Sequence, residues 1–302
     1  MLKKFFLDKR TISVVTIFVL TILSMGAFVF GGSKKETPPP PIVPIVVVPH
    51  ILKSEVIGTS VEGRDIKVFN YGTGATKLLF VGGIHGGYEW NSVLLAYQFM
   101  DHLETNPDII PKGVTVAIIP SANPDGMYAV TGKDGRFTAA DIPSKTTLGQ
   151  GRFNANKVDL NRNFDCKWQP KSTWKGNVVS AGSSAFSEPE AQAIRDFVSK
   201  FKPAAVVFFH SQSNAVYASE CQNGILLETI SIMNVYSKAS KYPAVDAFSA
   251  YEVTGDAEGW LASIGIPAIT VELSTHATVE WDRNLLGIKA LFNYYEQKTK
   301  AP

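Results

Sequence analysis

Three uninterrupted apolar runs constrain the fold of this chain more than any other feature. They are VTVAIIP (114–120), PAAVVFFH (203–210) and IPAITVEL (266–273), and all are rich in branched apolar residues. Continuous runs of this kind are typical of strands that are buried on both faces of a sheet. RDIKVFNYG (64–72) and KLLFVGG (77–83) also predict strands. The sequence therefore predicts a central sheet with both faces covered.

Helical patterns lie between these strands. One begins after Glu89, one at Ser187, one near Ile225, and the last covers residues 285–295. Ser187 and Glu190 have the spacing of a capping box, which marks a helix start. Strands that alternate with helices favour an α/β fold. We expect residues 51–302 to form one domain with a mixed, mostly parallel central β-sheet flanked by helices on both faces.

The N-terminal segment has a different character. Residues 11–33 form an uncharged, largely apolar run that follows four basic residues, Lys3, Lys4, Lys9 and Arg10. A transmembrane helix needs ~20 mainly apolar residues, and basic residues flank its cytoplasmic end. We expect a cytoplasmic N-terminus at 1–10 and a transmembrane anchor at 11–33, with the rest of the chain outside the cytoplasm. A cleaved signal peptide, which would give a secreted protein, is the alternative.

A proline-rich stretch at 34–50 separates that run from the expected domain. Its prolines at 38–41, 44 and 49 predict a stiff, extended stalk.

The formal net charge of the 302-residue chain is +2, so no broad basic face is expected. Charge therefore gives no support to nucleic-acid binding.

Polar residues follow the apolar runs at the points where three strands are expected to end. His85 and Glu89 follow the first of these strands, His210 ends the second, and Glu272 lies near the end of the third. Sites in α/β sheets form at the carboxyl ends of strands. Two imidazoles and one carboxylate suit a catalytic zinc ion and leave a fourth position for water, while a second carboxylate can accept a proton. For each histidine alone, a packed or surface position is the alternative.

An Asn-rich segment, GRFNANKVDLNRNFD (151–165), carries two arginines, Arg152 and Arg162. A guanidinium binds a carboxylate through two parallel hydrogen bonds. Beside a metal ion, Arg162 and the adjacent Asn161 would suit a free C-terminal carboxylate. On spacing alone, a surface turn with solvated arginines is the stronger interpretation.

Taken together, these segments resemble the zinc metallocarboxypeptidases related to carboxypeptidase A. The motifs that match in order are GTSVEGRDI, GGIHGGYEW, NPDGM, GRFNANKVDLNRNF, SEPEAQAI, FFHSQS and YEVTGDAEGW…ITVEL. The resemblance extends from about Ile51 to the last helix. It implies that one zinc ion is held by His85, Glu89 and His210, and that Glu272 is the general base.

The resemblance also implies roles for five other residues. Arg152 would polarise the scissile carbonyl, and Asn161 with Arg162 would bind the terminal carboxylate. Tyr251 would close over the substrate, and Asp159 would orient the first histidine ligand from behind. The sequence departs from the common His-x-x-Glu spacing by one residue. We expect a small bulge between His85 and Glu89, which two glycines make easy.

The loop before the Glu272 strand sets the floor of the side-chain pocket in the family. Here it reads TGDAEGW and contains Asp256 and Glu258. An acidic floor predicts a basic leaving residue, such as Lys, Arg or a diamino acid.

Cys166 and Cys221 both follow segments that are expected near the active site. We expect them to form a disulfide outside the cytoplasm, with two free thiols as the alternative.

The expected function is hydrolysis of the C-terminal peptide bond of peptides that end in a free carboxylate. Peptidoglycan stem peptides and nutrient peptides are both candidate substrates. Two other functions stay open, a small-molecule amide hydrolase on the same scaffold and a non-catalytic peptide-binding module. Arg162 and Tyr251 favour peptides as substrates, and the presence of Glu272 favours an enzyme.

Overall fold

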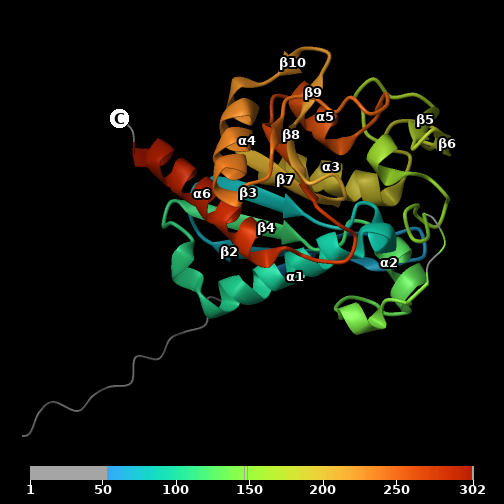
Figure 1. The fold of residues 1–302 in the computed structure, drawn as a ribbon, viewed down its shortest axis with the longest axis horizontal. Coiled ribbons are helices and arrows are strands. Elements are labelled where there is room, and N and C mark those ends of the chain that lie inside the picture. The colour runs from blue at the N-terminus through green and yellow to red at the C-terminus, as the bar shows by residue number, and fades with distance from the viewer. Residues whose placement is uncertain (1–52, 146, 148, 301–302) are drawn as a thin grey trace, which may run out of the picture. The chain divides into compact units, whose positions relative to one another are not determined.

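A computed structural model describes residues 53–145, 147 and 149–300 (Figure 1). Its centre is an eight-stranded sheet in the order β1–β2–β4–β3–β7–β12–β8–β11. The strands of this sheet are β1 (Lys53–Thr59), β2 (Asp65–Gly72), β3 (Thr76–Val81), β4 (Val114–Ile119), β7 (Ala205–Ser211), β8 (Ala215–Ala218), β11 (Ala244–Val245) and β12 (Ala268–Leu273). The four central strands, β4, β3, β7 and β12, run parallel, and antiparallel pairs flank them. The expected mixed α/β sheet is confirmed.

Helices cover both faces of this sheet. The core on one face includes residues of α1 (Trp90–Thr105), α4 (Leu227–Ser240) and α6 (Trp281–Lys300). The core on the other face includes residues of α3 (Pro189–Phe201) and α5 (Ala257–Ser263). Alternate residues of β3 enter the two cores, Leu78 and Phe80 the first, Leu79 and Val81 the second. This alternation explains the continuous apolar runs, because both faces of each central strand are buried.

The remaining elements are short and lie in the connections. They are η1 (Gly86–Glu89), η2 (Pro107–Ile109), α2 (Pro124–Thr131), η3 (Ala139–Asp141), η4 (Leu160–Arg162), and two small hairpins, β5 (Lys171–Trp174) with β6 (Asn177–Ser180) and β9 (Glu220–Cys221) with β10 (Gly224–Ile225). The η elements are 3₁₀ turns. Several of these segments contribute to the site described below.

The capping box expected at Ser187 is absent from the start of α3. The helix begins at Pro189, and Glu188 occupies the N-cap position without a side-chain cap. Ser187 Oγ donates instead to Glu188 Oε1 at 2.8 Å, and Glu190 Oε1 accepts from the backbone N–H of Val61 at 3.1 Å. The prediction was wrong because residues distant in the sequence contact both side chains: Asn163 Nδ2 donates to Ser187 Oγ at 3.0 Å, and Val61 donates to Glu190.

The expectation of a single-pass membrane protein needs correction. Within the described part of the chain, no helix has the length and apolar character that a bilayer crossing requires. The segments assigned to a cytoplasmic N-terminus (1–10), an anchor (11–33) and a stalk (34–50) lie outside the described residues. The membrane assignment therefore has no structural support and is withdrawn.

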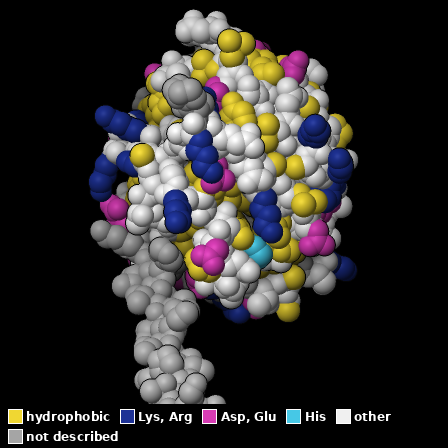
Figure 2. All heavy atoms as spheres, turned by 90° about the vertical axis from the view of Figure 1, so that its left-hand side faces the viewer, with side chains coloured by type: hydrophobic (Ala, Val, Ile, Leu, Met, Phe, Trp, Pro, Cys, Tyr) yellow, Lys and Arg dark blue, Asp and Glu magenta, His cyan; other side chains and the backbone are white. Residues whose placement is uncertain are grey.

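The surface view in Figure 2 shows one face of the molecule. On it, the Lys and Arg side chains of the described residues are interspersed with Asp, Glu and apolar side chains rather than gathered by sign. This distribution agrees with the formal net charge of +2.

Candidate metal centre and active site

Adjacent parallel strands bring the expected site residues together. β3 pairs with β7, and β7 pairs with β12, so the carboxyl ends of all three lie at one edge of the sheet. His85 and Glu89 follow β3, while His210 and Glu272 lie near the ends of β7 and β12. His210 and Glu272 are direct register partners. Side chains of register partners project from the same face of a sheet, so both point toward the same site.

The turn between His85 and Glu89 depends on a glycine. The residues Gly86–Glu89 form the 3₁₀ turn η1 in place of the expected bulge, and Gly86 has φ +45°. A Cβ at this position would lie 2.5 Å from the carbonyl oxygen of Gly151 and 2.9 Å from Gly126 Cα. Only glycine meets both requirements without strain. The turn places the carboxylate of Glu89 against the His85 ring.

The Glu89 carboxylate lies between two imidazoles. Glu89 Oε1 is 2.8 Å from His85 Nδ1, and Glu89 Oε2 is 3.0 Å from His210 Nδ1. Ligand atoms of these three buried residues all lie within 4.8 Å of one another. Two nitrogens and one carboxylate oxygen are a common ligand set for catalytic zinc, which binds them at ~2.0–2.2 Å. The donor atoms therefore fit a single zinc ion with small side-chain adjustments.

Charges around the site shift the pKa values of its residues strongly. Burial raises the pKa of Glu89, but the two imidazoles outweigh this effect and hold it well below its ordinary value. Burial lowers the pKa of His210, but Glu89 and Glu258 raise it well above its ordinary value. The positive charge of the imidazoles therefore compensates the buried Glu89 carboxylate. A divalent cation would supply the same compensation.

Carboxylates also lie behind both histidines. His85 Nε2 is 3.4 Å from Asp159 Oδ1, and His210 Nε2 is 3.1 Å from Glu258 Oε1. Asp159 Oδ2 accepts two hydrogen bonds from Arg152, from Nε at 3.0 Å and from Nη2 at 2.8 Å. Asp159 thus lies beside the first histidine, although His85 Nε2 has no hydrogen-bond partner among the described residues. Glu258, expected on the pocket floor, lines the cavity and also contacts the second histidine, and no sequence motif indicated this contact.

Glu272 presents an unpaired carboxyl to the same site. It lines the cavity with the metal-site residues, and its Oε2 is buried with no hydrogen-bond partner among the described residues. Burial and the nearby Glu89 carboxylate raise the pKa of Glu272 to about 8. A carboxyl with a raised pKa beside a metal site is suited to proton transfer near neutral pH.

A cavity of about 630 Å³ opens in front of the metal site. Arg152, Asn161, Arg162, Tyr251 and Glu258 all line it, so the structure brings the expected substrate residues to one place. Arg152 Nη1 lies 3.7 Å from Glu89 Oε1, which places its guanidinium next to the metal ligands. The cavity is large enough for the end of a peptide.

Arg162 and Asn161 already form hydrogen bonds with the backbone of the protein. Arg162 donates to the backbone carbonyls of Asn161 and Thr173, while its Nε is buried and has no hydrogen-bond partner among the described residues. Asn161 Oδ1 accepts from the backbone N–H of Ala257 at 2.8 Å. Asn161 therefore also fixes the start of α5.

Tyr251 and Asp256 lie in the segment before α5. Tyr251 is half-buried and packs edge-on against Phe248, with ring centroids 4.9 Å apart. Burial raises its pKa, so its hydroxyl stays protonated. Asp256 Oδ2 accepts from the backbone N–H of Gly259 at 2.7 Å and caps α5. Burial and the nearby Glu258 raise the pKa of Asp256 to about 6.

Aromatic side chains that the sequence did not indicate complete the wall around Arg152. Its guanidinium carbon lies 4.5 Å from the centroid of the Trp174 ring and 5.7 Å from that of Tyr88. Lys175 Nζ donates to Tyr88 Oη at 2.9 Å. Trp174 and Lys175 belong to the β5–β6 hairpin, which matches none of the quoted motifs. The local sequence gave no signal for this contact, because only the tertiary fold brings the hairpin to the site.

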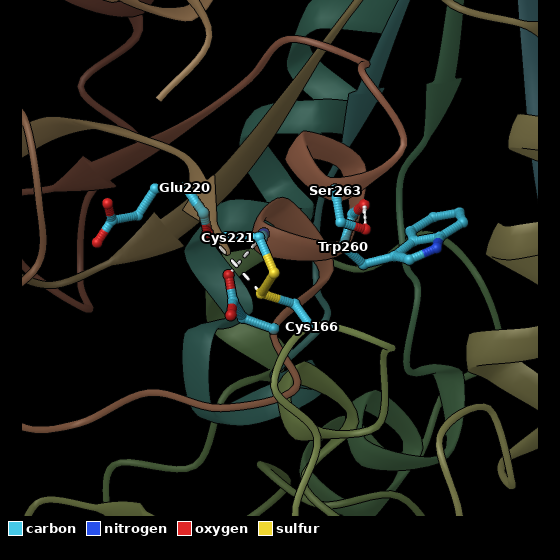
Figure 3. Close-up of a disulfide and its surroundings, with 7 residues drawn as sticks. Cys166, Glu220, Cys221, Trp260 and Ser263 are labelled. Atoms are coloured by element: carbon cyan, nitrogen blue, oxygen red, sulfur yellow. Dashed lines mark hydrogen bonds between the residues drawn. A yellow bond between two sulfur atoms is a disulfide. The ribbon is translucent and has the colours of Figure 1, made fainter. Parts of the chain in front are cut away.

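A disulfide joins Cys166 to Cys221 beside this cavity. Figure 3 shows the bridge close to Trp260 and Ser263 of α5. The carbonyl oxygen of Cys166 also accepts from the backbone N–H of Gly255 at 2.7 Å. The bridge therefore connects the segment that follows Arg162 to β9 and lies next to the loop that carries Tyr251.

Comparisons with known proteins agree with this geometry. A family profile described as zinc carboxypeptidase matches residues 47–281. Zinc carboxypeptidase A 1 of Anopheles gambiae is 34% identical over 167 residues, which cover 52% of this chain and 36% of the relative. Gamma-D-glutamyl-L-diamino acid endopeptidase 1 of Lysinibacillus sphaericus is 25% identical over 247 residues, which cover 74% of this chain and 61% of the relative.

A solved structure also has a similar fold. The structure of a murein-tripeptide amidase from Escherichia coli O157 superposes with a TM-score of 0.58 at 24% identity, covering 79% of this chain and 91% of that one. The chain spans less than two thirds of the length of both curated relatives above. The profile match over most of the domain, the α/β fold and the buried His-Glu-His site agree. This chain belongs to the zinc carboxypeptidase family.

Proposed function

We propose that the chain is a metallocarboxypeptidase that removes a C-terminal residue from peptides. The observation that carries this proposal is the buried Glu89 carboxylate between His85 Nδ1 and His210 Nδ1, at 2.8 and 3.0 Å. These three residues would hold one zinc ion. When bound, zinc lowers the pKa of a water molecule and polarises the scissile carbonyl.

Glu272 is the general base in this proposal. Its buried Oε2 has no competing donor among the described residues. The positive charge of a bound cation would lower its raised pKa, so that it could take a proton from the attacking water. The same carboxyl then donates this proton to the leaving amine. Arg152, held by Asp159 through two hydrogen bonds, would stabilise the negative charge that develops on the carbonyl oxygen.

Arg162 and Asn161 would receive the terminal carboxylate of the substrate. Both line the cavity, and the buried Arg162 Nε lacks a hydrogen-bond partner among the described residues. A carboxylate that pairs with Arg162 restricts cleavage to the end of a chain, because an internal peptide bond offers no such group. Tyr251, on the cavity wall, would cover the bound end of the peptide.

The leaving residue is proposed to be basic or a diamino acid. Asp256 and Glu258 make the inner wall of the cavity acidic, which favours an amine on the leaving side chain. Two of the similar proteins are named for γ-D-glutamyl-L-diamino acid and murein-tripeptide substrates. Peptidoglycan stem peptides are therefore the proposed natural substrates.

Peptides that end in Lys, diaminopimelate, Phe or Glu test this proposal, each with a free or an amidated terminus. We expect zinc-dependent release of Lys and diaminopimelate from free termini only, and loss of release with a chelator. Equal cleavage of amidated peptides would rule out an exopeptidase. A preference for Phe would exclude the acidic pocket but not the enzyme class.

A further inference from the structure

We propose that Glu258 is a positioning residue of the metal centre, which holds the His210 imidazole so that Nδ1 faces the ion. This inference rests on the metal site of the proposed function. It goes beyond that proposal because it gives Glu258, a residue of the acidic cavity wall, a second role beside a zinc ligand. Glu89 and Glu258 contact different nitrogens of the His210 ring.

His210 lies between two carboxylates on opposite sides of its ring. Its Nδ1 is 3.0 Å from Glu89 Oε2, and its Nε2 is 3.1 Å from Glu258 Oε1. A neutral imidazole carries one proton, and the partner of one nitrogen decides which tautomer forms. Glu258 can only accept when ionised, so Nε2 must donate to it. In the zinc-bound protein the ion would replace the contact between Nδ1 and Glu89, and Nδ1 would then offer the ion the lone pair that metal ligation requires.

Glu258 is itself held in a fixed position. Its side chain is 4% exposed, and its Oε1 also accepts from Thr270 Oγ1 at 3.0 Å. The Asn161 side chain also lies beside this carboxyl. Asn161 in turn accepts from the backbone N–H of Ala257, the residue before Glu258. A carboxylate with this many fixed partners is better suited to orient an imidazole than to follow different substrate side chains.

The carboxylates behind the two histidines differ in their distance to the imidazole and in their other hydrogen bonds. Asp159 lies 3.4 Å from His85 Nε2, but its Oδ2 is committed to two hydrogen bonds from Arg152. Glu258 makes the shorter contact, and no arginine pairs with it among the described residues. Carboxylates behind histidine ligands commonly contribute ~10–100-fold to metal affinity. Loss of Glu258 should therefore weaken zinc binding more than loss of an acidic residue elsewhere on the cavity wall.

The test compares zinc affinity in three full-length variants with wild type, by competition with a chromophoric chelator. Glu258→Gln removes the charge at constant shape, and Thr270→Val removes the hydroxyl that supports Glu258. Glu252→Gln is the matched control, because Glu252 is an exposed carboxylate on the wall of the same cavity. We expect Glu258→Gln to weaken zinc binding about tenfold or more, Thr270→Val to weaken it less, and Glu252→Gln to match wild type. The absorption spectrum of the cobalt-loaded protein should change in Glu258→Gln and stay unchanged in the control.

The possible results distinguish a failure of this inference from a failure of the proposed function. If Glu258→Gln binds zinc as tightly as wild type and changes only the preference for Lys over Phe as the leaving residue, the positioning role is overturned. Glu258 would then act only as an acidic residue of the side-chain pocket. If wild type itself binds no zinc, the proposed function fails as well. If Glu258→Gln does not fold, Thr270→Val decides, and unchanged zinc affinity in that variant overturns the inference.

Discussion

His210 and Glu272 are register partners on the adjacent parallel strands β7 and β12. One residue is an expected zinc ligand and the other the expected base, so the hydrogen-bonded sheet fixes their relative position. We expect Glu272→Gln to lower kcat by roughly 10²–10⁴-fold, the usual contribution of a general base. Zinc content should not change, because Glu272 lies outside the ligand set.

Steady-state kinetics and metal analysis of the same Glu272→Gln preparation check this expectation. Asp108→Asn, which removes the charge of an exposed carboxylate that does not line the cavity, is the control and should keep its kcat. A Glu272→Gln enzyme that retains near-wild-type kcat would remove Glu272 from the proton transfer.

Arg152 offers a second test of the chemistry. It is almost fully buried and donates from Nε and Nη2 to one oxygen of Asp159. A lysine cannot reproduce this fork, so we expect Arg152→Lys to lower kcat and kcat/KM by similar factors of about 10²–10³. Arg195→Lys, on the exposed side of α3, is the matched control. A change in KM alone would indicate a role in substrate binding rather than in stabilising the transition state.

The metal-free protein should lose stability as the pH rises through neutrality. The pKa of Glu272 is raised from 4.5 to about 8, and that of His210 lies well above 6.5. The lowered pKa values of His102 and His276 act in the opposite direction up to about pH 6.5. Between about pH 6.5 and 8 the folded state therefore binds more protons than the unfolded chain, and the free energy of unfolding falls with pH. The lowered pKa of Glu89 acts below pH 4.5 and does not oppose this trend. Thermal melting of chelator-treated protein from pH 5.5 to 8.5 measures it.

Zinc binding should show the opposite pH dependence. His210 must lose its proton before Nδ1 can bind a metal, so binding releases protons and tightens as the pH rises. Calorimetric titrations in buffers of different ionisation enthalpy count the released protons. A zinc affinity that is constant between pH 6 and 8 would show that His210 is already neutral in the metal-free protein.

The disulfide between Cys166 and Cys221 should stabilise the fold. It closes a loop with a sequence separation of 55 residues. Loop-closure entropy for this length corresponds to about 4 kcal/mol, so Cys166→Ser/Cys221→Ser should lower the free energy of unfolding by up to that amount. Urea denaturation measures the change. Reductant should destabilise the wild type and leave the double variant unchanged, and a wild type insensitive to reductant would show that the bridge does not form.

The sequence predicted the central strands well because their residues are buried on both faces and leave an unbroken apolar signal. Runs 114–120, 203–210 and 266–273 correspond to β4, β7 and β12. The short strands β8 and β11 beyond β12 were missed, since two to four residues carry no clear pattern. The capping box at Ser187 failed for a different reason, because Glu190 is bound by Val61 from a distant part of the chain.

The ends of the strands also indicated most of the candidate site. His85, Glu89, His210 and Glu272 follow apolar runs, so parallel pairing alone brings them together. The partner of Glu258 was not predictable, because 48 residues separate it from His210 and the loop motif fixes no side-chain direction. The contact of Trp174 with Arg152 likewise arises only from tertiary packing.

Anomalous X-ray diffraction at the zinc edge, from crystals grown with zinc, tests the central claim most directly. We predict a single strong peak within bonding distance of His85 Nδ1, His210 Nδ1 and the Glu89 carboxylate, about 2.0–2.2 Å from each donor atom. A zinc-soaked crystal with no peak there, or with these three side chains still in direct contact with one another, would contradict the account.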